Sequence, residues 1–328
     1  MPQILSFVFF AIGLLLIVKG SDFFLDAVIW CAKILHIPEV IMGATVVSIC
    51  TTLPELTVST ALAAEGKADM ALGNAYGAIA FNTGIILALS IIMLRPAMAE
   101  RRSLKQNALL LFAGVALSFL SGYLFGEFSR IIGGIFIGIF LFYLIKNGFD
   151  AVKEAKEKEK AEGETAAIPK EKTDAGKKIF KHIVLFIVGV VGIFFGAQLM
   201  VEHGTKIAEI LGIPEMIIAL TMTAVGTSLP ELFTTIPAIR KKKSDISIGG
   251  ALGANTINLF LILGVASVVH PLPIEGAFLQ RLLPLTALII AVAFYPVFTK
   301  KERYPRLSGW LAFVGYLIYV AALFISDL

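Results

Sequence analysis

Two short segments of nearly the same sequence each place a glutamate inside a long apolar stretch. They read Thr-Thr-Leu-Pro-Glu (Thr51–Glu55) and Thr-Ser-Leu-Pro-Glu (Thr227–Glu231), and they lie 176 residues apart. Neither apolar stretch has a lysine or arginine near its glutamate. An unpaired carboxylate at bilayer depth is energetically costly, and such residues commonly mark ion pathways. We therefore expect the two glutamates to hold a cation.

The residues around each glutamate supply oxygen ligands. A proline cannot donate to the carbonyl four residues earlier and pushes it away, so Pro54 is expected to free the carbonyl of Cys50, and Pro230 that of Gly226. Carbonyl, hydroxyl and carboxylate oxygens suit calcium or sodium and not zinc or copper. The side chains that offer such oxygens are Thr51, Thr52, Glu55, Thr227, Ser228 and Glu231.

An asparagine follows each glutamate 27 residues later, Asn82 in one case and Asn258 in the other, so each amide is expected on the next helix and can complete the shell. A lone hydroxyl in an apolar helix commonly bonds its own helix backbone, but two copies of the whole pattern at one spacing favour an ion site. Two carboxylates neutralise one divalent ion, two monovalent ions or two protons. Competition for that shared charge is a sufficient basis for antiport.

The elements that position these residues are predicted to be membrane-spanning helices. The chain is 57% hydrophobic and 16% charged, with a mean hydropathy of +0.86, and apolar runs of about 18 or more residues can cross the bilayer as helices. We predict an all-α polytopic membrane protein with ten transmembrane helices. The expected spans are 4–35, 38–64, 70–94, 104–124, 129–147, 179–211, 214–239, 246–269, 279–298 and 307–325.

The distribution of basic residues predicts the orientation of the spans. With the N-terminus outside, the outer connections hold little beyond Lys67, Arg130 and Arg281. Cytoplasmic connections carry an excess of lysine and arginine, so we predict a multi-pass protein of the inner (plasma) membrane, whose charges do not indicate nucleic-acid binding. The connections then placed inside hold Lys33, Arg95, Arg101, Arg102, Lys105, nine lysines from Lys153 to Lys181, Arg240 to Lys243, Lys300, Lys301, Arg303 and Arg306.

The chain also contains an internal repeat. Residues 37–82 align without a gap with residues 213–258, and 17 of the 46 positions are identical. Repeats of this kind are typical of secondary transporters. Each predicted half has five spans, so the second copy enters the membrane in the opposite orientation. We therefore predict two inverted five-helix repeats, 1–150 and 179–328, joined by a charged, partly helical cytoplasmic linker at 151–178.

The paired motifs resemble the two alpha-repeats of the cation/calcium antiporter superfamily, in particular the prokaryotic sodium/calcium exchangers. The family pattern Gly-Thr-Ser-Leu-Pro-Glu is intact at Gly226–Glu231 and modified at Cys50–Glu55. A second pattern, Gly-Asn-x-x-Gly-Ser-x-x-x-Asn or Asp, corresponds to Gly73–Asn82 and Gly249–Asn258. The resemblance implies that helices 2, 3, 7 and 8 enclose the ions and that slanting helices 1 and 6 slide to alternate access.

The resemblance also implies a role for each matching residue. Glu55 and Glu231 would bind calcium together with the backbone carbonyls of Thr51 and Thr227. Asn82 and Asn258 would form the middle polar pair. The flanking sodium sites would use the side chains of Thr51, Thr52, Thr227 and Ser228 and the carbonyls of Ser48 and Ala224.

Several positions depart from the family pattern. The serine expected in each second motif is Ala78 in one copy and Ala254 in the other, so two hydroxyl ligands for sodium are absent. Calcium keeps both carboxylates, whereas sodium depends on each neutral donor. Protons, or a mixed use of cations, are the alternative to sodium, because carboxyl groups in a low-dielectric pocket favour the neutral form. The proton/calcium branch of the family, however, shows Gly-Asn-Ala-x-Glu, which is absent here, so sodium is the preferred prediction.

Two other classes of function are weaker alternatives. An intramembrane enzyme that uses two glutamates would need a nucleophile, a phosphate-binding loop or a zinc motif, and the chain has no Gly-x-Ser-x-Gly, His-Glu-x-x-His or Walker-type sequence. A channel is disfavoured because duplicated broken helices in inverted repeats indicate alternating access. We predict a monomeric calcium antiporter without a cofactor, whose partners are the transported cations and the lipid bilayer.

Overall fold

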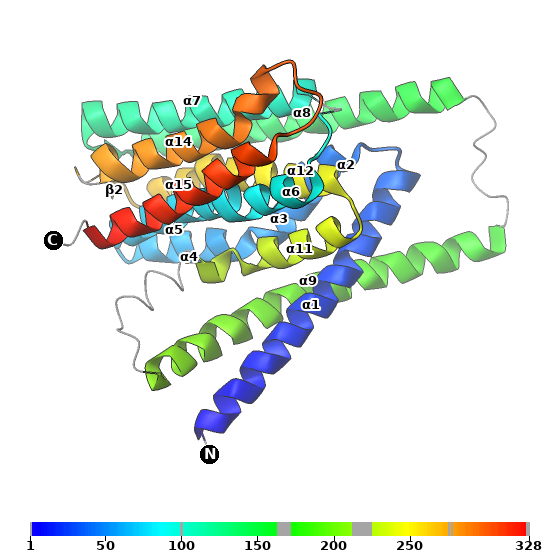
Figure 1. Ribbon diagram of the computed structural model, residues 1–328, viewed down its shortest axis with the longest axis horizontal. Helices are drawn as coiled ribbons and strands as arrows, with labels where there is room; N and C mark the ends of the chain where they lie inside the picture. Colours follow the sequence, from blue (N-terminus) through cyan, green and yellow to red (C-terminus); the bar gives the residue numbers. More distant parts are fainter. Residues whose placement is uncertain are drawn as a thin grey trace.

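The computed structural model describes residues 2–98, 101–162, 172–211, 225–274, 276 and 278–325. Within these residues the chain is almost entirely helical (Figure 1). The helices are α1 (Pro2–Ile34), α2 (Glu39–Met42), α3 (Ser48–Thr51), α4 (Leu53–Ala64), α5 (Ala68–Phe81), α6 (Ala88–Leu94), α7 (Arg101–Phe125), α8 (Arg130–Glu162), α9 (Lys172–Ile210), α11 (Leu229–Arg240), α12 (Ser244–Thr256), α13 (Leu263–Val269), α14 (Leu283–Phe294) and α15 (Arg306–Ile325).

The expectation of an all-α chain needs one small correction. Strand β1 (Glu127–Phe128) pairs antiparallel with strand β2 (Leu272–Pro273). The pair forms because Gly126, which follows the end of α7, has a φ of +68° that turns the chain. The Gly126 carbonyl then accepts a bond of 2.8 Å from the Ile274 amide. The two loops are thereby held together at one end of the bundle.

The structure supports a multi-span membrane protein. Eight described helical segments are long and apolar enough to cross a bilayer. A ninth candidate is the pair Glu39–Thr51 and Leu53–Ala64, whose axis bends by 49° at the break between them. The predicted span 214–239 lies only partly within the described residues, which resume at 225 and include α11. The first part of that span, including Ala224, lies outside them.

The first and sixth predicted spans, α1 and α9, are long helices that cross beside the rest of the bundle (Figure 1). Glycines permit the close crossing: a Cβ added at Gly20 would lie 2.9 Å from the carbonyl oxygen of Gly189, and one at Gly13 would lie 2.9 Å from that of Gly196. Their outer faces expose large apolar side chains such as Leu15 and Phe180. These two helices therefore face lipid and contact each other through backbone.

The core is made of the segments that carry the predicted motifs. Segment Ala68–Leu94, which contains α5 and α6, includes an 18-residue stretch that is 72% buried. The corresponding stretch of Ser244–Val269, which contains α12 and α13, is 78% buried. The other described candidate spans, the bent pair aside, are at most 44% buried. Helices α12 and α2 pack closely because Gly249 and Gly43 face the partner's backbone. Most side chains of these two segments therefore contact other helices and not lipid.

The repeat predicted from the sequence has matching local structure. Helices α4 and α11 both have 12 residues and start 176 positions apart, and α5 and α12 start at the same offset. A π-helical turn follows in each copy, at Asn82–Leu87 and at Ile257–Ile262. Such turns often occur at functional sites.

The described parts of the predicted linker 151–178 are helical. Helix α8 continues to Glu162 and α9 begins at Lys172, and residues 163–171 lie outside the described residues. At the same end of the bundle, the turn between α11 and α12 forms two ion pairs: Lys241 with Asp26 on α1, and Lys243 with Glu39 on α2, each at 2.5 Å. They connect the second predicted half to the first.

Candidate cation site

Each motif breaks its helix at the same position. Thr52 has φ −90° and ψ 8°, and its counterpart Ser228 has φ −86° and ψ 8°, so both leave the regular helical conformation. A new helix then starts, α4 after Thr52 and α11 after Ser228, with proline in its first turn, where the missing amide hydrogen does no harm. The break places the glutamate in the first turn of the new helix.

The two glutamates are bound crosswise by hydroxyls of the other motif. Ser228 Oγ donates to Glu55 Oε1 at 3.0 Å, and Thr52 Oγ1 donates to Glu231 Oε1 at 2.9 Å. Hydrogen bonds to an ionised acceptor are about twice as strong as neutral ones. The sequence prediction that the two motifs form one site is consistent with this geometry, which joins residues 173 and 179 positions apart.

The second oxygen of each carboxylate is buried without a hydrogen-bond partner among the described residues. These atoms are Glu55 Oε2 and Glu231 Oε2, and the residues are 0% and 5% exposed. A buried polar group without a partner costs about 1–3 kcal/mol, and more when it is charged. Two converging carboxylates therefore have unused acceptor capacity that a cation would satisfy.

The asparagines predicted as the middle pair lie on the two π-helical turns and are fully buried. The turn with Asn82 packs against α11, which carries Glu231, and the turn with Asn258 packs against α4, which carries Glu55. Asn258 Nδ2 donates to the Ala254 carbonyl at 2.9 Å. Both amide oxygens are buried without a donor among the described residues. These oxygens are thus available as neutral ligands.

The remaining predicted ligands have different surroundings. Thr51 Oγ1 donates to its own helix at the Val47 carbonyl, 3.1 Å away. Thr227 Oγ1 donates to Asn74 Oδ1 at 3.3 Å. The Ser48 carbonyl accepts the Thr52 amide at 2.9 Å. The position of the predicted ligand Ala224 lies outside the described residues.

Sequence reasoning missed two buried amides as members of this polar centre. Asn74 Nδ2 donates to Ser59 Oγ at 2.8 Å and approaches the Glu55 carbonyl at 3.4 Å. Asn255 Nδ2 donates to Thr83 Oγ1 at 2.8 Å and so connects α12 to the π-helical turn Asn82–Leu87. Asn74 stands in the second motif and could have been found there. Asn255 has isoleucine as its repeat counterpart, so the repeat gave no signal for it.

A narrow cavity reaches Glu231 from the side where α12 begins. Its polar wall includes Thr51, Thr234, Thr235 and Ser247. Ser247 Oγ also lies 2.5 Å from Ser90 Oγ, which joins α12 to α6. Hydroxyl groups thus line the cavity beside Glu231.

The donor set distinguishes the class of cation. Among the described residues no group of three or more His, Cys, Asp and Glu side chains could hold a metal ion. The centre offers two carboxylates, amide oxygens and hydroxyls. Hard cations bind such oxygens, and softer transition metals prefer nitrogen and sulfur ligands.

Comparison with known proteins gives consistent matches over nearly the whole chain. The sodium/calcium exchanger MaX1 of Methanosarcina acetivorans is 28% identical, with 97% of each chain covered. The inner membrane protein YrbG of Escherichia coli (strain K12) is 30% identical, with 95% of each chain covered. These relatives match the chain from end to end and not at the motifs alone.

A solved structure has the same fold. The sodium-calcium exchanger NCX_Mj, in a structure with sodium and without calcium, superimposes with a TM-score of 0.81 at 29% identity, over 98% of this chain and 99% of that one. The family described as sodium/calcium exchanger protein matches residues 5–147 and 181–325, which include both motifs and leave out the predicted linker. The chain is therefore a member of the sodium/calcium exchanger protein family, which is a family of membrane transporters.

Proposed function

We propose that this chain is a secondary active antiporter that exchanges calcium for sodium by alternating access. The observation that carries the proposal is the pair of buried carboxylates, Glu55 and Glu231, each bound through one oxygen by the other motif and each with its second oxygen unpartnered among the described residues. Two negative charges balance one calcium ion. The same charges can instead balance sodium ions, so the two ions compete for one site.

Sodium is the proposed counter-ion because neutral oxygens surround the carboxylates. The hydroxyls of Thr51, Thr52, Thr227 and Ser228, with the oxygens of Asn82 and Asn258, suit sodium coordination. Relatives named as sodium/calcium exchangers support this choice. In this proposal the ions are transported substrates and the chain needs no cofactor.

The proposed topology has ten spans in two inverted five-helix repeats. The matching offsets of α4 with α11 and of α5 with α12 support the repeat, and the basic residues support an external N-terminus and a cytoplasmic linker in the plasma membrane. Helices α1 and α9, which contact each other through glycines, are proposed to slide against the core. The site lies within one chain, so a monomer suffices.

The proposal is tested with purified protein in liposomes. Calcium-45 uptake is measured with an outward sodium gradient alone and, in parallel, with an outward proton gradient alone. We expect the sodium gradient to drive uptake and the proton gradient to leave it near the protein-free level. Uptake driven only by protons would replace sodium with protons as the counter-ion. Uptake driven by neither gradient would contradict antiport.

The crossed hydroxyls should matter for ion affinity. Thr52→Ala or Ser228→Ala removes a bond to a carboxylate worth about 1.5–3 kcal/mol, so we expect calcium affinity to fall about tenfold or more. Each matched control introduces the residue type found at the equivalent position of the other motif. The Thr52→Ser and Ser228→Thr variants keep the hydroxyl and should bind calcium nearly as the wild type does. Calcium-45 equilibrium binding measures both. Equal loss in the alanine variants and the controls would show that packing, and not the hydroxyl, is required.

The two alanines at the family's serine positions give a gain-of-function prediction. Ala78 and Ala254 are both fully buried in the core helices α5 and α12. Ala78→Ser or Ala254→Ser adds one neutral oxygen, and we expect the sodium concentration for half-maximal exchange to fall severalfold. Calcium affinity should change little, because both carboxylates remain. Unchanged sodium dependence in both variants would place the sodium ligands elsewhere.

A further inference from the structure

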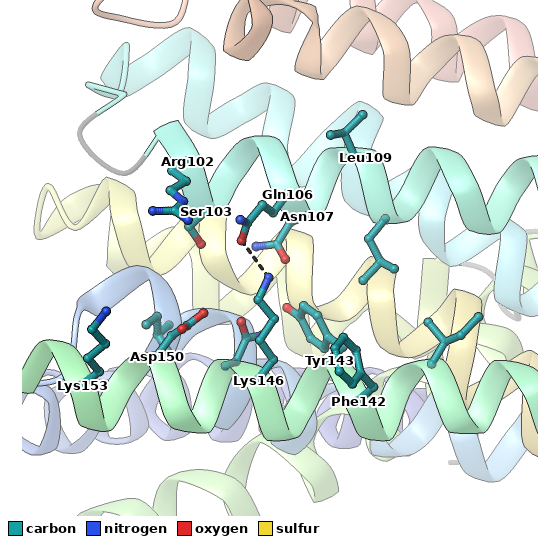
Figure 2. Close-up of a pocket in the computed structure, with 14 residues that line it drawn as sticks. Arg102, Ser103, Gln106, Asn107, Leu109, Phe142, Tyr143, Lys146, Asp150 and Lys153 are labelled. Atoms are coloured by element: carbon teal, nitrogen blue, oxygen red, sulfur yellow. Dashed lines mark hydrogen bonds between the residues drawn. The ribbon is translucent and has the colours of Figure 1, made fainter.

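A large cavity lies between α7 and α8, away from the cation site. Its volume is about 860 Å³, and Figure 2 shows its lining side chains between the two helices. Cavities of this size hold small molecules or parts of larger ones. Its lining residues include Arg102, Gln106, Leu109, Phe142, Lys146 and Asp150.

One end of the cavity is basic. Arg102 is exposed and forms no ion pair with a described residue, and Lys146 Nζ donates to the neutral amide oxygen of Gln106 at 3.0 Å (Figure 2). Asp150 is the one carboxylate among the lining residues. Arg102 and Lys146 outnumber that carboxylate, so this end attracts an anion.

The other end of the cavity is apolar and open to lipid. Leu109 is 50% exposed and Phe142 is 69% exposed, and both lie within helical segments long enough to span the bilayer. Between the two ends, the hydroxyl of Tyr143 and Nδ2 of Asn147 are buried without a hydrogen-bond partner among the described residues. Tyr143 is only 6% exposed. The cavity thus has a cationic end and an apolar end, and two unsatisfied buried donors lie in the helix wall between them.

We propose that this cavity binds one anionic phospholipid, with the phosphate at Arg102 and Lys146 and the acyl chains along Leu109 and Phe142. Basic pockets between transmembrane helices are known to bind anionic headgroups. The order of the lining residues favours a lipid over free phosphate, because apolar side chains continue from the basic end toward the middle of the two helices. The inference does not depend on which ions the exchanger transports.

The test is native mass spectrometry of the full-length protein in detergent, titrated with phosphatidylglycerol or with phosphatidylcholine. We expect one phosphatidylglycerol to bind preferentially to the wild type. The Arg102→Ala/Lys146→Ala double variant loses two charges, each worth about a factor of five at the membrane surface, so its affinity should fall about thirtyfold. Asp150→Asn removes the opposing carboxylate and should bind more tightly than the wild type.

A matched control removes two cations elsewhere. Lys300→Ala/Arg303→Ala changes exposed basic residues outside the cavity and should retain wild-type lipid binding. Equal phosphatidylglycerol binding by the wild type and the Arg102→Ala/Lys146→Ala variant would overturn the proposal, as would equal binding of the two lipids. Displacement of the lipid by millimolar inorganic phosphate would also overturn it, because the site would then recognise free phosphate. Asp150→Asn keeps the test decisive if the double variant fails to fold.

Discussion

Glu55→Gln and Glu231→Gln should each abolish calcium exchange while the protein still folds. Each change removes one of the two charges that balance calcium but keeps the size of the side chain and an acceptor for the bond from Ser228 or Thr52. Removing one member of a buried charge pair costs about 2–5 kcal/mol, which corresponds to a loss of affinity of about thirtyfold or more. Sodium-driven calcium-45 uptake into liposomes measures the effect.

The control for this prediction is a glutamate at the end of the same helix. Glu65 follows α4, is exposed, and pairs with Lys67 at 2.6 Å. Exposed ion pairs contribute about 0–1 kcal/mol, so Glu65→Gln should transport calcium as the wild type does. If either Glu55→Gln or Glu231→Gln kept half or more of the uptake, the shared two-carboxylate site would be wrong.

The second large effect is expected at a glycine whose repeat counterpart provides the control. A Cβ at Gly249 on α12 would contact the Val40 carbonyl oxygen of α2, whereas a Cβ at Gly73 on α5 would meet nothing within 4 Å. Overpacking typically costs about 1–3 kcal/mol, and alanine in an open helical position favours the helix by about 1 kcal/mol over glycine. We expect Gly249→Ala to lower the Tm and Gly73→Ala to leave it unchanged or raise it slightly.

Thermal unfolding of the purified variants in detergent measures this difference. Both positions are the first glycine of the second motif, so sequence alone assigns them the same role in helix packing. The structure separates the two positions, because a Cβ added at Gly73 would lie in open space. An equal decrease in Tm for Gly249→Ala and Gly73→Ala would contradict the packing described for α12.

Hydropathy and the internal repeat predicted much of this fold. Long apolar runs predicted the spans because a helix that crosses lipid must satisfy its backbone internally, and the offset of 176 residues predicted that α4 and α11 correspond. The repeat also indicated that Glu55 and Glu231 share one site, which the crossed bonds of Thr52 and Ser228 support. These features can be predicted from the sequence because they depend on residue type and spacing alone.

Other features depend on contacts between distant segments that no repeat or periodic pattern in the sequence indicates. The pairing of β1 with β2 depends on where two loops meet, and the bond between Asn255 and Thr83 joins positions whose repeat counterparts are apolar. The cavity between α7 and α8 depends on how far apart two helices stand. The sequence already placed Arg102 in a cytoplasmic connection, which is consistent with the basic end of the cavity. The sequence cannot show that a cavity exists, because that depends on the spacing of α7 and α8.

The most direct test of the account is the stoichiometry of calcium binding to the purified protein without sodium, measured by calcium-45 equilibrium dialysis. If Glu55 and Glu231 form one site, the wild type binds one calcium ion per chain with high affinity, and either single glutamine variant loses it completely. Two calcium ions per chain in the wild type, with one retained in each variant, would contradict a single site shared by the two motifs.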